Sequence, residues 1–378
     1  MILGILKERV AGETRVAITP ETAKKLKSQY GLQILFEADC GVSAGFPDSL
    51  YRDAGADLSA RESILSRADL IPLIKKPASE EVSRMKPGSC IFAWLEPFKD
   101  DGTFASLAQA KVSAFAMELI PRTSRAQSMD ALSSQANIAG YRAVIEAATH
   151  YPRFFPMMMT SAGSAKQVKL AVLGAGVAGL QAIATARRLG ATVEAFDIRP
   201  EVKEQIQSVG AKFIEIDLGE SGSGQGGYAK ALSEDSQTKL QSALAERLKK
   251  FDVIITTANI PGRRAPLLVT EDAVKGMRPG SVIVDLAAEN GGNCPLSEAG
   301  TVVQKHGVTL VGYTHYPAMV PADSSSFYAK NIANLLSLML KKEKDSPAAS
   351  LVIDLKDDIL DAALITHQGE IRYPKKQN

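Results

Sequence analysis

The sequence is poor in the residues from which disulfides and metal sites are built. It contains three cysteines and four histidines among 378 residues. The cysteines lie far apart, show no CxxC spacing and are odd in number, which argues against both a disulfide framework and a zinc site. No two histidines stand at ligand spacing along the chain. We therefore expect reduced thiols and no bound metal; the residues concerned are Cys40, Cys90, Cys294, His150, His306, His315 and His367.

Neither sign of charge is in excess, and no apolar run is long. The chain has 44 basic and 42 acidic residues, whereas nucleic-acid binders show a basic excess or basic stripes. The longest apolar runs, such as residues 335–340, are far shorter than the ~20 residues of a membrane helix. The N-terminal segment has no basic region and no small-residue cleavage site, so it predicts a strand and not a signal peptide. We expect a chain that is soluble on its own and has no nucleic-acid partner.

The length and the order of the apolar segments predict two α/β domains. A chain of 378 residues is too long for one ordinary core. In the first 120 residues, β-like runs alternate with helical stretches, which is typical of a parallel sheet with helices on both faces. Thr19 as an N-cap and Pro20 as the first helical residue predict one helix start. Strands are predicted at residues 2–6, 33–37, 70–74, 89–94 and 113–117.

A second α/β segment follows a predicted connecting helix at residues 133–148. Pro152 and Pro156 end this helix, and residues 157–164 predict a linker rich in methionine and small residues. One doubly wound sheet of six strands is then expected, at residues 168–173, 191–197, 212–215, 252–256, 281–285 and 308–311. The remaining sequence predicts a helix at 329–341, a charged turn at 341–349, and an amphipathic helix with a short extended end at 351–371.

The sequence GAGVAG at residues 174–179 points most directly to a ligand. It follows an apolar strand and begins a helix of small residues, which is the context that a dinucleotide-binding turn requires. Gly174, Gly176 and Gly179 allow the backbone to approach a pyrophosphate, and the helix N-terminus offers free N–H groups and a positive dipole end. The alternative is a tight strand-to-helix turn without a ligand.

Asp197 ends the next predicted strand, twenty-one residues after Gly176. A carboxylate in this position accepts hydrogen bonds from the ribose hydroxyls and repels a 2′-phosphate, so NAD(H) is favoured over NADP(H). Arg199 follows two residues later and can instead hold a 2′-phosphate. We give Asp197 more weight because it has the strand-end position.

Further cofactor contacts are expected at the carboxyl edge of the second sheet, where dinucleotides bind. The residues TANIPG, at 257–262, follow the strand at 252–256 and are expected at this edge. A plain strand-to-loop junction explains any single one of them equally well. The candidates at this edge and around the glycine turn are Val177, Ala178, Ile198, Thr257, Ala258 and Leu286.

Residues 219–230, GESGSGQGGYAK, contain five glycines and two serines around Tyr228. The composition favours a solvated linker. The alternative is a mobile lid that places the ring of Tyr228 over a bound nucleotide.

The segment PRTSRAQSMDALSSQAN at residues 121–137 crowds polar side chains ahead of a helix. In one interpretation, Asp130 and the serines are helix caps and Arg122 is a surface charge. In the other, Gln127 bonds a carboxamide, while Arg122 and Asp130 hold each other and the amide of a pyridine ring. Composition leaves both interpretations open.

Acid–base candidates are scarce. Lys75 follows a predicted strand, and Arg15 lies in an N-terminal turn. Reduction of a carbonyl requires a proton donor near the nicotinamide. Hydride transfer between two nicotinamides requires none, only close and ordered rings.

Several segments resemble one family. GILKERVAGETRVAITPE resembles the family that alanine dehydrogenase shares with the NAD(H)-binding component (domain I) of proton-translocating NAD(P) transhydrogenase. RTSRAQSMDALSSQANIAGYRAVIEAA resembles the transhydrogenase "RQD" loop. DVIITTANIPG, VDLAAENGGNCPLSE and DDILDAALITHQGE agree with it as well, so the resemblance covers nearly the whole chain.

The resemblance implies a fold and a set of site residues. The fold is α/β, with two Rossmann-like doubly wound domains joined by long helices: residues 1–135 with 321–378, and the dinucleotide-binding domain at 136–320. Asp197 would hold the adenosine ribose, the three glycines of the turn the pyrophosphate, and Tyr228 would lie on the mobile loop. The residues that would hold the nicotinamide end, the first three in a catalytic role, are Arg122, Gln127, Asp130 and Ser133.

The resemblance also implies an activity and partners. NADH on this chain would donate a hydride to NADP⁺ on an NADP(H)-binding subunit, coupled to proton passage through a membrane-spanning subunit. The chain would be a homodimer in the cytoplasm, peripheral on the cytoplasmic face of the inner membrane through these subunits. An alanine dehydrogenase-like oxidoreductase and a non-catalytic NAD(H)-binding protein are the alternatives.

The sequence departs from the family pattern at three places. Alanine dehydrogenase is expected to have a histidine soon after the fifth strand, where this chain has Glu96, although Arg15 and Lys75 match substrate residues of that enzyme. An apolar residue is expected at Asn259. Asparagine is expected near His315 and a polar residue near Ala318, within residues 315–319.

Overall fold

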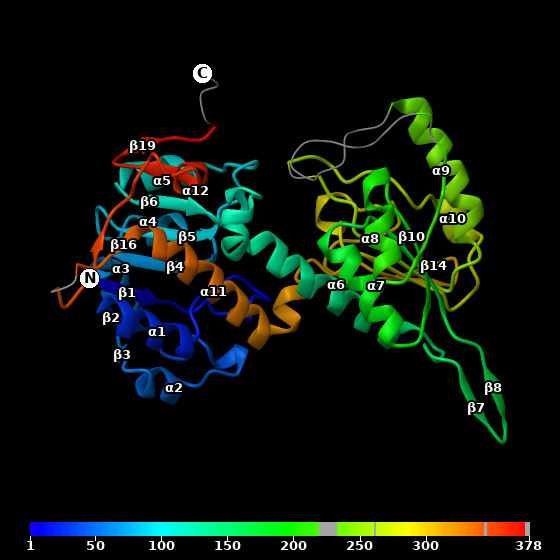
Figure 1. The fold of residues 1–378 in the computed structure, drawn as a ribbon, viewed down its shortest axis with the longest axis horizontal. Coiled ribbons are helices and arrows are strands. Elements are labelled where there is room, and N and C mark those ends of the chain that lie inside the picture. The colour runs from blue at the N-terminus through cyan, green and yellow to red at the C-terminus, as the bar shows by residue number, and fades with distance from the viewer. Residues whose placement is uncertain (218, 220–232, 261, 344–345, 375–378) are drawn as a thin grey trace. The chain divides into compact units, whose positions relative to one another are not determined.

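The computed structural model describes residues 1–217, 219, 233–260, 262–343 and 346–374. The chain divides into two compact units. The first unit comprises Met1–Gln135 and Ala318–Asn378, and the second comprises Ala136–Pro317 (Figure 1). The second unit is thus inserted into the chain of the first.

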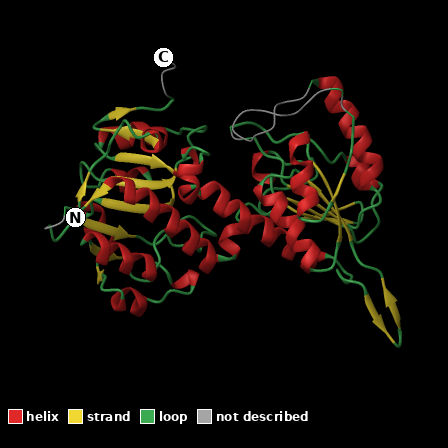
Figure 2. Cartoon of the chain, in the orientation of Figure 1, coloured by secondary structure: helices red, strands yellow, loops and turns green. Residues whose placement is uncertain are grey.

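The first unit is built on an eight-stranded sheet with the order β19-β18-β6-β5-β4-β1-β2-β3. Figure 2 shows strands flanked by helices in each unit. Neighbouring strands from β6 to β3 are parallel, whereas β18 is antiparallel to both β6 and β19. Along the sheet the strand numbers fall from β6 to β4 and then rise from β1 to β3, so the chain changes its winding direction between β4 and β1. The strands are β1 (Ile2–Ile5), β2 (Gln33–Phe36), β3 (Asp57–Leu58), β4 (Leu70–Lys75), β5 (Cys90–Trp94), β6 (Ser113–Ala116), β18 (Leu364–His367) and β19 (Glu370–Ile371).

Alternate strand residues face two hydrophobic clusters, so helices cover both faces of this sheet. Phe92 and Phe115 lie in one cluster, with residues of α1, α11 and α12. Ile91 and Ala114 lie in the other, with residues of α3, α4 and α5. The helices are α1 (Pro20–Tyr30), η1 (Val42–Ala44), α2 (Asp48–Asp53), α3 (Arg61–Arg67), α4 (Ser79–Val82), α5 (Thr103–Gln109), η2 (Met117–Leu119), η3 (Ser124–Met129), α11 (Pro321–Met339) and α12 (Asp358–Ala363).

The second unit contains a seven-stranded sheet with the order β11-β10-β9-β12-β13-β15-β14, whose described strands are parallel except for β14. These strands are β9 (Lys169–Leu173), β10 (Thr192–Phe196), β11 (Lys212–Phe213), β12 (Val253–Thr256), β13 (Val282–Asp285), β14 (Val302–Lys305) and β15 (Val308–Val311). The helices are α7 (Val177–Arg188), η4 (Pro200–Val202), α8 (Lys203–Ser208), α9 (Glu234–Leu248), α10 (Glu271–Lys275), η6 (Ala288–Asn290) and η7 (Tyr316–Met319). Helix α6 (Ala131–His150) runs from the first unit into the second.

The predicted fold class is confirmed, and so is the first helix. Thr19 caps α1 by accepting a hydrogen bond from the N–H of Thr22, and Pro20 begins the helix. Gly31, with φ of 66°, ends it in the left-handed conformation that glycine adopts without strain. The connecting helix is longer than predicted at both ends, and the helix predicted at 329–341 begins earlier, at Pro321.

Three predictions about strands were wrong. The second sheet has a seventh strand, β14, which His306 and Gly307 connect to β15, both with positive φ. The expected linker at 157–164 contains a hairpin, β7 (Met158–Thr160) with β8 (Gly163–Ala165). In the C-terminal segment the helix is only six residues long, and a hairpin turning at Gln368 and Gly369 follows it. Two adjacent residues with positive φ form the turn whose twist matches a tight hairpin.

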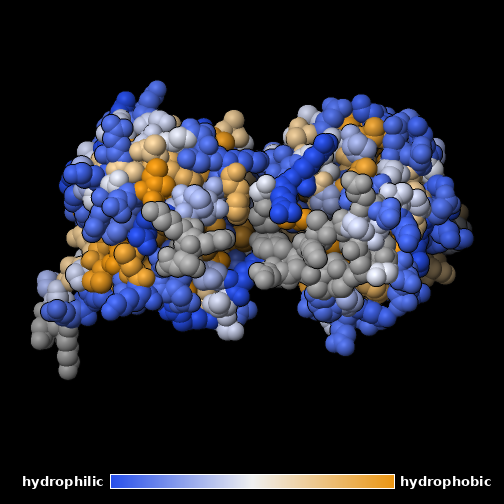
Figure 3. Space-filling view, turned by 90° about the horizontal axis from the view of Figure 1, so that it is seen from above, coloured by the Kyte–Doolittle hydropathy of each residue, from blue (hydrophilic) through white to orange (hydrophobic). Residues whose placement is uncertain are grey.

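No helix in the described ranges combines the length and the apolar character that crossing a bilayer requires. Most of the face shown in Figure 3 is hydrophilic, with hydrophobic residues in separate small patches.

Candidate dinucleotide site

The glycine turn of the second unit joins β9 to α7 and is tightly packed at two of its three glycines. Gly174 has φ of 99°, and a Cβ on this residue would lie 2.7 Å from Oγ1 of Thr257. A Cβ on Gly179 would lie 1.9 Å from the carbonyl oxygen of Gly174. A Cβ on Gly176, in contrast, would meet no atom of the described residues within 4 Å. The first and third glycines therefore serve close packing, and the second faces open space at the helix N-terminus.

The start of α7 presents backbone rather than side chains. Among the described residues, no side chain caps the helix at Gly176. Val177 is exposed and Ala178 is half-buried. Uncapped N–H groups at the positive end of a helix attract anions such as a pyrophosphate. Helix α6 packs closely against the first turn of α7, because a Cβ on Gly140 would lie 2.1 Å from the carbonyl oxygen of Ala178.

Asp197 follows β10 and is joined to the glycine turn. Its Oδ2 accepts a hydrogen bond from the N–H of Ala175 at 2.8 Å. Arg199 donates to both oxygens, from Nε to Oδ1 and from Nη2 to Oδ2, each at 2.9 Å, and its backbone N–H also bonds Oδ1. These bonds raise the pKa of Arg199. Ile198, between them, packs partly buried against the core.

The other edge candidates lie at the carboxyl ends of β12 and β13. Thr257 donates its hydroxyl hydrogen to the carbonyl oxygen of Gly174 at 2.9 Å, and its backbone N–H bonds Leu173. Thr257, Ala258 and Leu286 are all half-buried. Since β12 and β13 flank β9 on one side and run parallel to it, these residues share one edge with the glycine turn.

Two residues that sequence reasoning missed fix the loops of this edge. Asn293 is fully buried and donates from Nδ2 to the carbonyl oxygens of Ala258 (2.8 Å) and Pro266 (2.7 Å). Asp285 accepts hydrogen bonds from the Thr256 hydroxyl and from backbone N–H groups of the following loop. The sequence signal for them was weak: Asp285 ends an apolar strand, and Asn293 lies in the segment ENGGN that follows it. Asn259, one of the departures, is exposed and accepts a bond from Asn290 at 3.3 Å.

The segment with Arg122, Gln127 and Asp130 lies in the first unit and includes η3. Oδ1 of Asp130 accepts the N–H of Ser133 at 2.9 Å, and its Oδ2 accepts the Ser133 hydroxyl at 2.6 Å. Asp130 thus caps the start of α6, as one of the two interpretations had it. Arg122 and Gln127 are exposed. Tyr228, the remaining candidate, lies outside the described residues.

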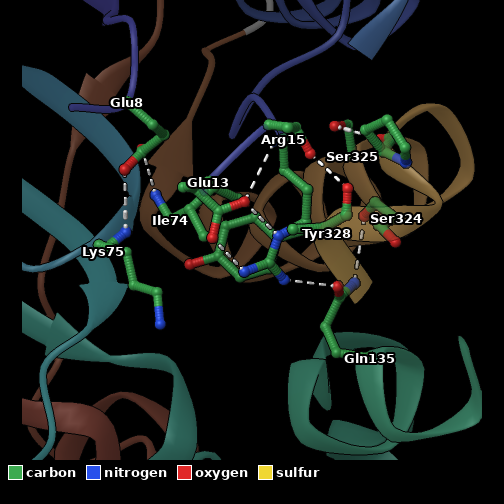
Figure 4. A network of polar contacts seen from close by, with 12 residues as sticks. Glu8, Glu13, Arg15, Ile74, Lys75, Gln135, Ser324, Ser325 and Tyr328 are labelled. Atoms are coloured by element: carbon green, nitrogen blue, oxygen red, sulfur yellow. Dashed lines mark hydrogen bonds and ion pairs between the residues drawn. The ribbon is translucent and has the colours of Figure 1, made fainter. Parts of the chain in front are cut away.

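A buried polar network occupies the carboxyl edge of the first sheet at the point where the strand order reverses (Figure 4). Arg15 is 6% exposed, and its guanidinium donates to Glu13, at 2.7 and 2.6 Å, and to Oε1 of Gln135, at 2.8 Å. The carboxylate of Glu8 accepts the backbone N–H groups of Ile74 and Lys75, while the Lys75 side chain extends away from it. Burial raises the pKa of Glu8 to about 7. The charge of Arg15 is thus paired with Glu13, and the carboxylate of Glu8 is bound by backbone N–H groups.

Glu96 does not reproduce the environment of a buried acid–base group. It follows β5 in a left-handed conformation, with φ of 51°. Its side chain is 49% exposed and lies 3.7 Å from Nζ of Lys76. The buried carboxyl nearby belongs to Glu118, whose Oε1 accepts the N–H groups of Leu95 and Glu96. Burial raises the pKa of Glu118 to about 7.

In the second unit, a parallel sheet, a glycine turn that opens a helix and a carboxylate after the next strand together define a dinucleotide-binding protein of the Rossmann class. The chain belongs to the alanine dehydrogenase/PNT family. The family model "Alanine dehydrogenase/PNT, N-terminal domain" matches residues 4–139, and "Alanine dehydrogenase/PNT, C-terminal domain" matches residues 143–374. The predicted family resemblance is thereby confirmed.

Within the family, the chain shares more of its sequence with transhydrogenase subunits than with the alanine dehydrogenases compared. It is 46% identical to the first polypeptide of the NAD(P) transhydrogenase alpha subunit of Rhodospirillum rubrum, covering 99% of this chain and 98% of that protein. The crystal structure of transhydrogenase from Sinorhizobium meliloti matches with a TM-score of 0.85 and 41% identity, covering 99% of both chains. An alanine dehydrogenase of Staphylococcus haemolyticus is 29% identical over 86% of this chain and 83% of that enzyme.

Proposed function

We propose that this chain is the NAD(H)-binding subunit of a proton-translocating NAD(P) transhydrogenase, and that it passes a hydride from NADH to NADP⁺ bound on a partner subunit. The observation that carries the proposal is the glycine turn joined to Asp197 through Ala175, in a chain with 46% identity to a transhydrogenase alpha subunit over nearly its full length. Proton translocation belongs to a membrane-spanning subunit, through which this chain is peripheral on the cytoplasmic face of the membrane.

The cofactor's adenosine half is held by the second unit. The backbone of Gly174, Gly176 and Gly179 and the N-terminus of α7 take the pyrophosphate, because no described side chain caps the helix at Gly176. Asp197 takes the ribose hydroxyls. Val177, Ala178, Thr257, Ala258 and Leu286 line the same region, with Ile198 and Arg199 beside Asp197.

The nicotinamide end is bound by Arg122, Gln127, Asp130 and Ser133. The family resemblance assigns Tyr228 to the same cofactor, and this residue lies outside the described ranges. The amide of Gln127 is exposed and can bond a carboxamide, which orients the ring. When bound, the nicotinamide supplies the hydride. Transfer to a second nicotinamide needs ordered rings and no proton donor, which agrees with the exposed, Lys76-paired state of Glu96.

The homodimer is part of the proposal. Four large apolar side chains are exposed in or beside the β7–β8 hairpin, with exposed fractions between 40% and 75%: Phe154, Met157, Met158 and Met159. Clustered exposed apolar residues of this kind mark protein contacts. A second copy of this chain is the partner that we propose for them.

The test compares two reactions of the purified chain. One contains the NADP(H)-binding component, NADPH and an NAD analogue whose reduced form absorbs at a distinct wavelength, so that transfer is visible. The other contains NADH, pyruvate and ammonium. Turnover only with the partner component supports the proposal. Turnover with pyruvate and ammonium alone would instead identify an alanine dehydrogenase, and NADH binding without transfer to any acceptor would identify a sensor.

The variant Gln127→Asn sharpens the test. Shortening the amide by one methylene keeps its chemistry but moves it, so we expect hydride transfer to slow at least tenfold while NADH affinity changes less than threefold. Equal losses of rate and affinity would reduce Gln127 to a binding residue. Gln109→Asn, at the end of α5 on the surface of the same unit, is the matched control.

A further inference from the structure

An arginine next to Gln127 is bound by the C-terminal segment. Arg125, in η3, donates from Nη1 to Oδ2 of Asp357 at 2.8 Å and from Nη2 to Oδ1 at 2.9 Å. Nη2 also donates to Asp358. The hydrogen bonds with Asp357 raise the pKa of Arg125, and those with Arg125 lower the pKa of Asp357. Such a bidentate ion pair fixes the orientation of the guanidinium as well as its distance from the carboxylate.

Asp357 is itself held in place. Its Oδ1 caps α12 by accepting the N–H groups of Ile359 (3.0 Å) and Leu360 (3.2 Å). Both of these side chains are buried in the core that the helix shares with the first sheet. The strand that follows, β18, pairs with β6. The carboxylate that receives Arg125 is therefore part of the rigid body of the first unit.

A second restraint acts on the other side of Gln127. The carbonyl oxygen of Ser128 accepts hydrogen bonds from Nδ2 of Asn331 (2.9 Å) and Nδ2 of Asn334 (3.0 Å), both on α11. Oδ1 of Asn331 accepts the Ser134 hydroxyl at 2.7 Å. Helix α11 thus holds the backbone one residue after Gln127, and the start of α12 holds the side chain two residues before it.

The ion pair of Arg125 adds a restraint on η3 beyond its core contacts, and its contribution to the stability of the fold is expected to be small. Arg125 is 48% exposed, and ion pairs at that exposure contribute little to folding. Ala126 and Met129 already anchor η3 in the core. What the ion pair adds is a fixed position for the Arg125 side chain, two residues before Gln127. A displacement of about 1 Å near a reacting group costs on the order of a hundredfold in rate.

We propose that Asp357, together with Asp358, is a positioning residue for hydride transfer, which holds Arg125 and through it the amide of Gln127. The proposal rests on the proposed function. It assigns a role to the C-terminal sequence DDILDAALITHQGE, which the dinucleotide site leaves unused.

The test separates positioning from structure by the choice of variants. Asn is as good a helix cap as Asp, so Asp357→Asn with Asp358→Asn keeps the cap of α12 and removes the charge that holds Arg125. Arg125→Gln removes the other partner, and Arg125→Lys keeps the charge without the two-pronged geometry. Lys305→Gln, which breaks an ion pair of similar exposure on β14, is the control.

We expect the double asparagine variant and Arg125→Gln to lower kcat of transfer with the partner component about five- to tenfold. NADH affinity should stay within twofold and Tm within about 2 °C, with Arg125→Lys intermediate and Lys305→Gln unchanged. Unchanged kcat in both variants, or a joint fall of kcat, affinity and Tm, would overturn the positioning role. If the wild-type chain transfers no hydride with the partner, the proposed function fails first and the inference falls with it.

Discussion

Arg199 bonds both carboxylate oxygens of Asp197, two residues before it in the chain, at 2.9 Å each. With the N–H groups of Ala175 and Arg199 added, four donors share a carboxylate that has about four acceptor positions. In the proposed site, a ribose hydroxyl would therefore have to displace one of these donors, and the Arg199 guanidinium is the one on a side chain. In the proposed site, this carboxylate would disfavour a 2′-phosphate in two ways, by its own charge and by binding the nearest arginine.

This relationship predicts a change of cofactor preference. In Asp197→Ala, NADH affinity should fall about tenfold or more because charge-assisted hydrogen bonds of roughly 1.5–3 kcal/mol each are lost. NADPH affinity should rise, because the side chain of Arg199 is released from the carboxylate and can meet the 2′-phosphate. Titration of both nucleotides against Asp197→Ala and the double variant Asp197→Ala with Arg199→Ala measures this. A gain in NADPH affinity that persists without Arg199 would contradict the assignment.

The glycine turn predicts different effects on stability for two similar substitutions. Gly179→Ala would place a Cβ 1.9 Å from the carbonyl oxygen of Gly174, so the turn or the helix has to move, at a cost of about 1–3 kcal/mol of stability. Gly176→Ala meets no described atom within 4 Å and should unfold like the wild type. Urea unfolding with and without NADH separates the two.

Gly176→Ala is also the more specific probe of the ligand. If the pyrophosphate approaches the backbone there, the added methyl group weakens NADH binding while stability is unaffected. Wild-type affinity in Gly176→Ala would mean that the phosphates bind elsewhere.

The sequence predicts the central parallel strands of both sheets because these strands are apolar runs that can be recognised without knowledge of their partners. The glycine turn and Asp197 are also local patterns, twenty-one residues apart. What escaped prediction depends on contacts between distant residues or on unusual backbone. Arg125 and Asp357 are 232 residues apart, and no local pattern connects them. The missed hairpin turns use His306 and Gln368 at positive φ, a conformation for which neither residue type is a strong signal.

The part of the site that depends on local sequence patterns was predictable, and the part that depends on distant contacts was not. The residues around the turn share one sheet edge because parallel strands end together. The competing interpretations of Asp130 could not be separated from the sequence, because a cap and a ligand contact require the same residue type in the same place. The hydrogen bonds that Ser133 donates to Asp130 show that this carboxylate caps the helix. A carboxylate that caps a helix still has acceptor positions for a ligand.

The buried carboxyl of Glu118 predicts how stability depends on pH. Burial raises its pKa from 4.5 to about 7 in the folded chain. Between these values the folded state holds a proton that the unfolded state has released. The free energy of unfolding therefore falls as pH rises from about 4.5 to 7, and the loss is complete above the folded pKa. Glu8, raised to about 7 as well, acts in the same direction.

Glu118→Gln isolates this contribution. Oε1 of Glu118 accepts the N–H groups of Leu95 and Glu96, and Oε2 is buried with no hydrogen-bond partner among the described residues. Glutamine keeps the acceptor and imitates the protonated acid. Its unfolding free energy should therefore decline less between pH 5 and pH 8 than that of the wild type, by on the order of 1–2 kcal/mol. Urea unfolding at both pH values measures the difference, and Glu62→Gln on the exposed face of α3 is the control. A wild-type slope in Glu118→Gln would show that the pKa of this carboxyl does not differ between the folded and unfolded states, and the pH dependence would then have to come from other groups such as Glu8.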